Sequence, residues 1–210
     1  MVIRSSFVQS GRVHNYTMRW LPACTAVACY NGNEVHVDKD SSVRAYLDIE
    51  TTFDGAISVI GIYRSDLGAI QLIGGGVRDV ALYDALEGVN TLVTFNGSSF
   101  DLPVIRKRLF VDLRRDFDHC DLMHVCRKRG LRGGLKIVEE RLGICRITHG
   151  LNGRDALYLW DRYEKQGDQS ALRTLLTYNY EDVINLAILD ERLGLTPPGD
   201  LCRVVRHIFA

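Results

Sequence analysis

Apolar positions follow two different spacings along the chain, and the change between them predicts an α/β fold. Three short runs, at residues 43–49, 56–64 and 68–73, are rich in β-branched residues and are predicted strands. Asp54-Gly55 separates the first two, and Gly74-Gly75-Gly76 follows the third as a turn. The short connections predict that these strands form an antiparallel meander.

Strands and helices alternate after this meander. Two further strands are expected at 91–95 and 118–120. Helical spacing is found over residues 79–88, 102–110, 122–129, 134–142, 155–166, 169–177 and 179–193. A meander followed by alternating strands and helices predicts a mixed sheet, with antiparallel and parallel strands, flanked by helices.

The first part of the chain has a different pattern. Residues 1–42 are mixed and weakly periodic, and we expect an N-terminal appendage, partly helical, that packs on a main domain formed by residues 43–210. The 210 residues are 46% hydrophobic, which is enough for one sizeable core. The apolar segment 204–209 is expected to add an edge strand or to pack on the domain.

Charge is balanced along the chain as a whole, with 26 basic and 26 acidic residues. A net-neutral protein does not bind polyanions through bulk charge, so any contact with nucleic acid needs a local patch. Basic residues concentrate in the middle third, as Arg106, Lys107, Arg108, Arg114, Arg115, Arg127, Lys128, Arg129, Arg132 and Lys136. Two interpretations stay open for them: solvated helix faces, or a track for phosphates.

The sequence favours a cytoplasmic protein that makes no contact with membranes. No apolar run reaches the roughly 18 residues of a membrane-spanning helix. Residues 20–29 only weakly resemble a secretion signal, because they lie behind a polar leader and contain Pro22. The six cysteines have no C-x-x-C spacing, and we expect reduced thiols.

Acidic residues occur in three short segments whose settings suggest a shared site. Asp48 and Glu50 are two apart in a predicted strand, so both side chains point to one face. Two adjacent carboxylates repel unless a cation lies between them. The alternative is a solvated sheet edge, which the apolar neighbours Leu47 and Ile49 disfavour.

The other two segments are ambiguous when each is considered alone. Asp101 follows a predicted strand and a loop, where an aspartate is commonly a helix cap. Tyr178 and Asp182 are four apart and share a helix face, although an exposed pair would have the same spacing. Asp182 is preferred to Glu181 because it shares that face, and Asp121 is expected to cap the helix after it.

Together the three segments provide four carboxylates, which suit a pair of hard divalent ions such as Mg²⁺ or Mn²⁺. Two such ions can clamp the attacking and leaving oxygens of a displacement at phosphorus. The four acids are therefore a candidate centre for phosphodiester hydrolysis.

The same segments resemble motifs of the DEDD superfamily of 3′–5′ exonucleases, the DnaQ-like group with a ribonuclease H-like fold. D-x-E-T-T at 48–52, F-N-G-x-x-F-D at 95–101 and Y-x-x-x-D at 178–182 match its three motifs, the last in the tyrosine form called DEDDy. The string 92–103 and several short pieces, at 121–122, 135–136, 140–144, 178–179 and 182–183, are similar to the YprB-like branch, and the likeness spans about residues 43–194.

This resemblance implies a role for each of nine residues. Two Mg²⁺ or Mn²⁺ ions would be held by Asp48, Glu50, Asp101 and Asp182, and Tyr178 would orient the attacking water. Thr51, Thr52 and Phe53 would contact the terminal nucleotide, and Asn96 would position the substrate or brace the site. Tyr158, Trp160 and Tyr163 fall at helical spacings and are expected in the core rather than in a base-stacking platform.

The expected function is a metal-dependent 3′–5′ exonuclease that acts on single-stranded ends of DNA or RNA. No element that would recognise the 2′-hydroxyl is evident, so the two substrates are not distinguished. Two alternatives stay open: a ribonuclease H-like endonuclease, and a nucleic-acid-binding module whose site is catalytically silent.

Overall fold

A five-stranded mixed sheet forms the centre of the protein in the computed structural model, which describes residues 3–9, 12–18 and 43–196. The strands are β3 (Arg44–Thr51), β4 (Ile57–Arg64), β5 (Gly68–Ile73), β6 (Thr91–Thr94) and β7 (Asp118–Asp121). Their order is β5-β4-β3-β6-β7, with antiparallel pairing among β3, β4 and β5 and parallel pairing from β3 to β6 and β7. The predicted meander with added parallel strands is confirmed.

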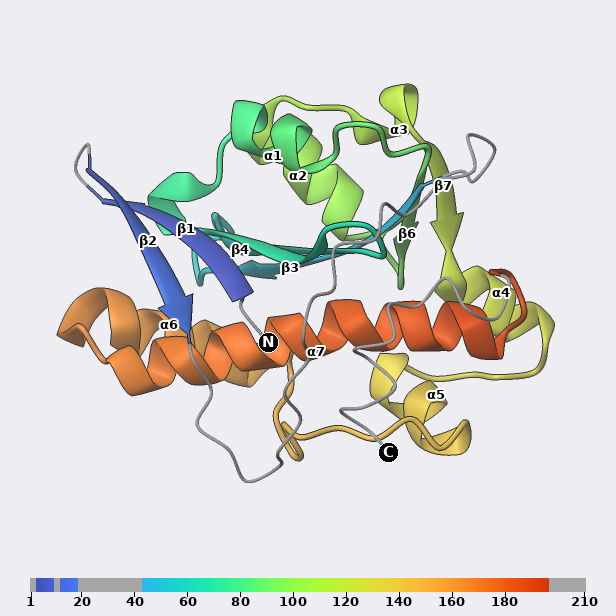
Figure 1. Cartoon of the computed structure of the whole chain (residues 1–210). Helices are drawn as coiled ribbons and strands as arrows, with labels where there is room; N and C mark the ends of the chain where they lie inside the picture. Colours follow the sequence, from blue (N-terminus) through green and yellow to red (C-terminus); the bar gives the residue numbers. More distant parts are fainter. Residues whose placement is uncertain (1–2, 10–11, 19–42, 197–210) are drawn as a thin grey trace, which may run out of the picture.

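Helices cover both faces of this sheet (Figure 1). They are α1 (Asp79–Ala85), α2 (Asp101–Leu109), α3 (Leu113–Asp116), α4 (Leu122–Lys128), α5 (Leu135–Arg141), α6 (Gly153–Gln166) and α7 (Gln169–Arg192), with a 3₁₀ turn, η1, at Gly74–Gly76. The helices α1 and α2 lie on one face, and the long α7 crosses the other with α6 beside it (Figure 1). The short helix α3 was not predicted.

The central strand β3 divides the core into two parts. Ala45, Leu47 and Ile49 pack in the cluster beneath α1 and α2, whereas Tyr46 packs in the cluster beneath α7. Because side chains alternate along a strand, every even-numbered residue of β3 points toward α7. The two acids of this strand are therefore directed to the α7 face.

Helix α7 is continuous, and the predicted break between residues 177 and 179 is wrong. The carboxylate of Asp168 caps its start by accepting from the N–H groups of Ser170 and Ala171 at 2.9 and 3.0 Å. No glycine or proline occurs from Gln169 to Arg192, so nothing in the sequence ends the helix at Tyr178.

Two strands, β1 (Ile3–Gln9) and β2 (Arg12–Met18), form an antiparallel pair beside the main sheet, with β1 against β5. The described part of the N-terminal segment is thus extended, and it contains none of the helix that was expected for part of residues 1–42. Most of that segment, and the predicted edge strand at 204–209, lie outside the described residues. The division of the chain after residue 42 stays a prediction.

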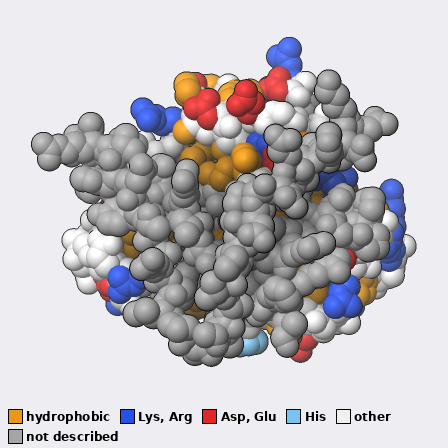
Figure 2. All heavy atoms as spheres, viewed as in Figure 1, with side chains coloured by type: hydrophobic (Ala, Val, Ile, Leu, Met, Phe, Trp, Pro, Cys, Tyr) orange, Lys and Arg blue, Asp and Glu red, His pale blue; other side chains and the backbone are white. Residues whose placement is uncertain are grey.

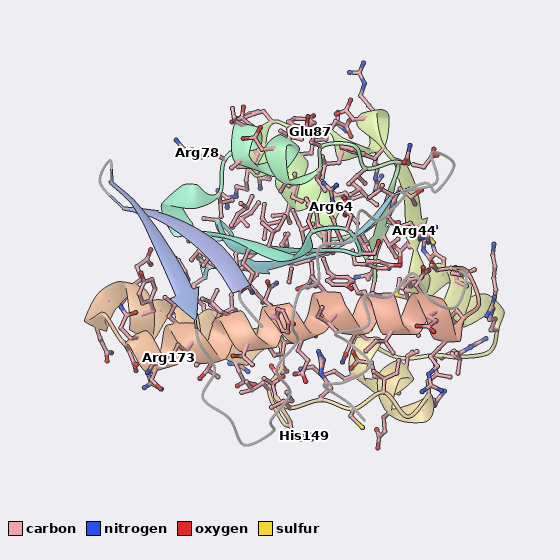
Figure 3. The ribbon with its side chains drawn as sticks, in the orientation of Figure 1. Arg44, Arg64, Arg78, Glu87, His149 and Arg173 are labelled. Atoms are coloured by element: carbon pink, nitrogen blue, oxygen red, sulfur yellow. The ribbon has the colours of Figure 1, made fainter. Side chains whose placement is uncertain are left out.

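Arg64 anchors helix α1 to the sheet (Figure 3). Its guanidinium donates to the carbonyl oxygens of Ala85 and Glu87 at 2.9 and 2.7 Å, at the end of α1, and pairs with Asp66 at 2.6 Å. This buried cation has partners on three sides, which offsets the cost of removing it from water.

The exposed surface of α1 is mixed in character. Figure 2 shows acidic and apolar side chains close together over this helix. Such a surface does not attract a polyanion, so a nucleic-acid contact is not expected there. Among the described residues, no helix combines the length and the apolar character that crossing a bilayer would require.

Candidate metal site

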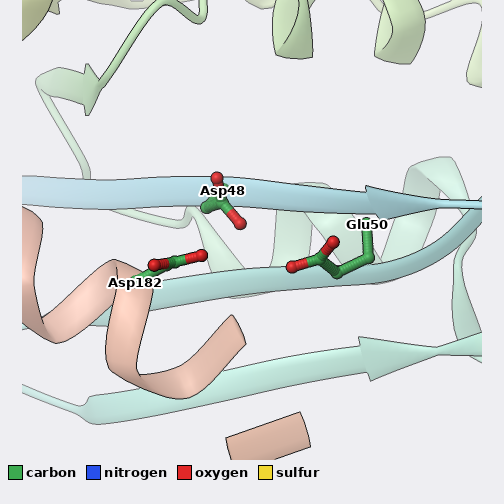
Figure 4. A group of neighbouring side chains, drawn as sticks. All are labelled: Asp48, Glu50 and Asp182. Carbon is green, nitrogen blue, oxygen red and sulfur yellow. The ribbon is translucent and has the colours of Figure 1, made fainter. Parts of the chain in front are cut away.

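Three carboxylates from two elements converge between β3 and α7. One oxygen from each of Asp48, Glu50 and Asp182 lies within 4.8 Å of the others, and their side chains turn toward one another (Figure 4). The solvated-edge interpretation of Asp48 and Glu50 does not hold, because β3 is the central strand and Glu50 is buried.

Asp182 reaches this group from α7, one helical turn after Tyr178, and both side chains are buried. Its neighbour Glu181 faces elsewhere and accepts from the N–H of Ile147, and at 3.0 Å from that of Thr148. The structure therefore places Asp182 rather than Glu181 beside the strand acids, and the exposed-pair alternative does not hold.

Asp101 lies close to this group but outside the set of three. It is the first residue of α2, and one carboxylate oxygen accepts the N–H of Ile49 at 3.1 Å. That N–H is accessible because β6 pairs with β3 only as far as Tyr46. Asp101 thus braces the acidic strand, instead of acting as an ordinary helix cap.

The electrostatics of the cluster show why it would favour a cation. Burial raises the pKa of Asp48 to about 7, although a hydrogen bond from Asn179 and the charges of Arg146 and Lys136 oppose the shift. Burial, together with the charges of Asp48 and Asp101, raises the pKa of Glu50 well above its usual range. The charged forms of these acids are disfavoured until a positive charge joins them.

The donor set fits a hard divalent cation. Carboxylate oxygens are the ligands that such ions prefer. Within the described part of the chain, the buried Oε1 of Glu50 has no hydrogen-bond partner, and a bound cation would satisfy it. Asp48, Glu50 and Asp182 would hold the ion, and Asp101 lies near enough to raise the pKa of Glu50.

Arg146 opposes this interpretation. Its buried guanidinium donates to Oδ1 of Asp182 and pairs with Glu139 at 3.2 Å, so Asp182 already has a cation beside it. A carboxylate has two oxygens and about four lone pairs, so this contact leaves Asp182 capacity for another partner. Arg146 and a metal ion would therefore compete for the carboxylate of Asp182.

Two cationic side chains lie near the ring of Tyr178. Nζ of Lys136 lies 4.5 Å from the centre of its ring, and Cζ of Arg146 lies 5.7 Å from it. Burial, followed by the charges of Glu50 and Asp48, raises the pKa of the phenol. The hydroxyl therefore stays protonated at neutral pH and can donate a hydrogen bond.

The loop before α2 is held by Asp121 and by an unusual backbone. Asp121 accepts from the N–H of Met123 at 3.1 Å, as the predicted cap of α4, and also from the N–H groups of Asn96 and Ser98. Asn96 adopts a φ of 67°, a conformation that asparagine tolerates better than most residues. At Gly97 a Cβ would lie 2.2 Å from Oγ1 of Thr94, so the Asn-Gly pair has a structural cause.

The residues after Glu50 form a turn and an exposed aromatic edge. The hydroxyl of Thr52 accepts the N–H of Ala56 at 2.9 Å, and Thr51 lies at an irregularity of the β3–β4 pairing. Phe53 is 56% exposed and meets Tyr158 edge-on at 5.1 Å between ring centres. Tyr158 is itself 50% exposed, so its prediction as a core residue is wrong.

The predicted basic cluster divides into separate environments. Lys136 belongs to the acidic site, where it contacts the ring of Tyr178. Arg108 and Arg114 donate to the carbonyl oxygens of Asp54 and Ser98, and Arg106 pairs with Asp112 at 3.4 Å. Several of these cations thus hold loops around the site, which neither sequence interpretation anticipated.

Two residues of the site had no role in the sequence predictions. Arg146 lies in the loop between α5 and α6, where no motif marks it. Asn179 follows Tyr178 and donates to Oδ2 of Asp48 at 3.1 Å. The sequence shows that Asn179 lies within the third motif, but only the fold shows that its side chain faces β3.

Comparison with known proteins supports the fold. Residues 45–194 match a family model described as the RNase_H superfamily. A Bacillus subtilis (strain 168) protein, "Uncharacterized protein YprB", is 32% identical over 125 residues, which cover 53% of this chain and 30% of that protein. The chain thus spans under a third of that relative.

A solved structure gives the same result. The family B DNA polymerase from the hyperthermophilic archaeon Pyrobaculum calidifontis superposes with a TM-score of 0.58 and 18% identity. The superposition covers 73% of this chain and 24% of that chain, and at this identity the likeness shows the fold alone.

Proposed function

The chain belongs to the RNase H superfamily, and from that premise we propose that it is a metal-dependent 3′–5′ exonuclease of the DEDDy type. Membership of this superfamily suggests a nuclease, and superfamily members typically use divalent metal ions. The observation that carries the proposal is the approach of Asp48, Glu50 and Asp182 to within 4.8 Å of one another. Phosphodiester hydrolysis is the chemistry for which such an oxygen cluster is suited.

In this proposal Asp48, Glu50, Asp101 and Asp182 hold two divalent cations, Mg²⁺ or Mn²⁺. When bound, such ions activate a water for attack at phosphorus and stabilise charge on the leaving oxygen. Asp101 also keeps Ile49, and with it the acidic part of β3, in place through its hydrogen bond.

Tyr178 is proposed to orient the attacking water. Its raised pKa keeps the phenol protonated, so it donates a hydrogen bond and does not act as a base. The ring is confined by Lys136 on one side and by the buried cluster of Val59, Leu175 and Leu176. A fixed hydroxyl can direct a lone pair of the water toward phosphorus.

The substrate is proposed to be a single-stranded end of DNA or RNA. Unpaired bases stack on exposed aromatic rings, and Phe53 and Tyr158 provide two such rings just beyond the acidic strand. Thr51, Thr52 and Asn96 complete the proposed contacts to the terminal nucleotide. The basic side chains of α2 and α4 would contact phosphates further along the strand.

A second candidate function has one observation in its favour. Arg146 pairs with Asp182, as expected for a site that has replaced a metal ion with an internal cation. The protein would then bind nucleic acid without cutting it.

A cleavage assay separates these candidates. A single strand of DNA and one of RNA, each labelled at the 5′ end, would be incubated with the full chain and Mn²⁺, with and without a chelator. A ladder that shortens by one nucleotide at a time and disappears with chelator supports the exonuclease. A single internal cut identifies an endonuclease, and binding without cleavage identifies the silent module.

A further inference from the structure

Three residues form a row across the antiparallel half of the sheet, directly beneath α7. Asp48 on β3 is the register partner of Gly61 on β4, and Gly61 is the register partner of Gln71 on β5. Asn179 on α7 spans this row and contacts both of its outer members. The amide of Asn179 thus links Asp48, a proposed metal ligand, to β5, which carries no proposed ligand.

The hydrogen bonds of the row fix the orientation of each amide. Gln71 donates from Nε2 to the carbonyl oxygen of Leu176 at 2.8 Å, and a carbonyl can only accept. The same NH₂ group donates to Oδ1 of Asn179 at 3.0 Å. Asn179 must therefore direct its own NH₂ group at Asp48, where it donates to Oδ2 at 3.1 Å and more weakly to the backbone oxygen at 3.4 Å.

The space for this bridge exists because residue 61 is glycine. A Cβ at Gly61 would lie 2.2 Å from Oδ1 of Asn179, closer than any real contact. Asn179 is 0% exposed, and moving its side chain aside would break its hydrogen bonds to Gln71 and Asp48. The absence of a side chain at Gly61 of β4 thus makes room for the amide of Asn179.

We propose that Asn179 is a positioning residue, which holds the Asp48 carboxylate in the orientation that binds a divalent cation. Gln71 sets the direction of the Asn179 amide, and Gly61 provides the space for it. The inference rests on the proposed function, because it treats Asp48 as a metal ligand. A purely structural bridge between α7 and the sheet would affect stability but not the affinity for metal ions.

Two variants test the chain of contacts from Gln71 through Asn179 to Asp48, one at the residue that touches Asp48 and one at the residue behind it. Asn179→Ala removes the donor to Asp48. Gln71→Met keeps a side chain of similar length but removes the donor that holds Oδ1 of Asn179, and it introduces no charge. Gln71 does not touch the proposed ligand, and an effect of this uncharged variant on metal affinity would therefore act through Asn179.

A matched control lies on the same helix. Asn185 is buried like Asn179, but its Nδ2 donates to the carbonyl oxygen of Cys145 at 3.4 Å instead of to a proposed ligand. Asn185→Ala therefore removes a buried amide from α7 without disturbing the row. It measures what the loss of such an amide does to stability alone.

The experiment is a Mn²⁺ titration by calorimetry on the full chain, with the melting temperature of each variant measured in parallel. We expect both Asn179→Ala and Gln71→Met to bind Mn²⁺ about 10-fold or more weakly than wild type, as is usual when a residue that orients a ligand is lost. Asn185→Ala should keep the wild-type affinity. Asn179→Leu, which keeps a side chain of similar size without a donor or a charge, replaces Asn179→Ala if that variant fails to fold.

The outcomes separate this inference from the proposed function. Wild-type affinity in folded Asn179 and Gln71 variants would overturn the positioning role, even if the wild-type protein cleaves nucleic acid. Weakened affinity in both variants of a protein that cleaves nothing would uphold the positioning role and refute the nuclease. A wild-type protein that binds no Mn²⁺ would overturn both.

Discussion

Arg146 donates a hydrogen bond to Asp182, and this contact places a positive charge beside a proposed metal ligand. The guanidinium also pairs with Glu139 at 3.2 Å and lies 3.9 Å from Glu181. It thus provides the positive charge that keeps three buried acids of α5 and α7 together.

Replacing Arg146 should destabilise the protein strongly when no metal ion is present. Arg146→Ala leaves three buried carboxylates without their cation, and breaking a buried pair costs about 3–5 kcal/mol. Arg162→Ala is the matched control, because its ion pair with Asp168 is exposed and such pairs contribute about 0–1 kcal/mol. Urea unfolding in chelator measures both.

Adding Mn²⁺ should restore part of the stability of Arg146→Ala, since an ion at Asp182 replaces the lost charge. Equal losses of unfolding free energy in the two arginine variants, or no effect of Mn²⁺ on Arg146→Ala, would show that Arg146 does not take the place of a metal ion.

Metal-free protein should lose stability as the pH rises through neutrality. The pKa of Asp48 is raised from about 3.8 to about 7 in the fold, so the folded state favours the protonated acid. Its contribution to stability is therefore fully present below pH ~4 and is lost as the pH rises through ~7. Melting temperatures in chelator between pH 4 and 8 should fall more steeply for wild type than for Asp48→Asn. If the melting temperatures of the two proteins changed with pH in parallel, the raised pKa of Asp48 would be contradicted.

Removing single acids should abolish activity without unfolding the chain. We expect Asp48→Ala and Asp182→Asn to release nucleotides at least about 10²-fold more slowly than wild type, the usual effect of removing one group that stabilises transition-state charge. Removing one carboxylate also relieves repulsion among the others, so Asp48→Ala should melt no lower than wild type in chelator. Asp84→Asn, an exposed acid on α1, is the control and should leave turnover unchanged. Unchanged activity in either site variant would remove that residue from the site.

The exposed aromatic edge should contribute to the binding of single strands. Phe53→Ala and Tyr158→Ala each remove a ring on which an unpaired base can stack, which costs about 1–3 kcal/mol per base. Phe110→Ala is the matched control, because Phe110 is 90% exposed but lies at the far end of α2. Fluorescence anisotropy with labelled oligonucleotides, in an Asp48→Asn background, compares the three. If Phe53→Ala and Tyr158→Ala lost no more affinity for the oligonucleotide than Phe110→Ala does, these two rings would be excluded from the substrate site.

The sequence predicted the strands well because their apolar residues are continuous and their boundaries carry turn residues. The same local logic placed Asp48 and Glu50 on one face of β3, since that follows from strand geometry alone. It failed within α7, where a break was placed at Tyr178 although no residue there interrupts a helix. Local patterns thus determine the elements more reliably than their ends.

Features that depend on tertiary contacts could not be predicted. Arg146 is separated from Asp182 by 36 positions and lies in a loop whose course only the fold reveals. The need for glycine at position 61 appears only when α7 is packed over the sheet. Tyr158 has the spacing of a core residue, yet it lies at the margin of the core, where helical periodicity does not distinguish buried from half-exposed positions.

Asp48, Glu50 and Asp182 are proposed to form a binding site for divalent cations, and a Mn²⁺ titration of wild type against Asp48→Asn and Asp84→Asn tests this most directly. We predict saturable binding of two ions to wild type and to Asp84→Asn, with a rise in melting temperature, and at least about 10-fold weaker binding to Asp48→Asn. Identical titrations for all three proteins, or no saturable binding to wild type, would show that these residues do not form a metal site.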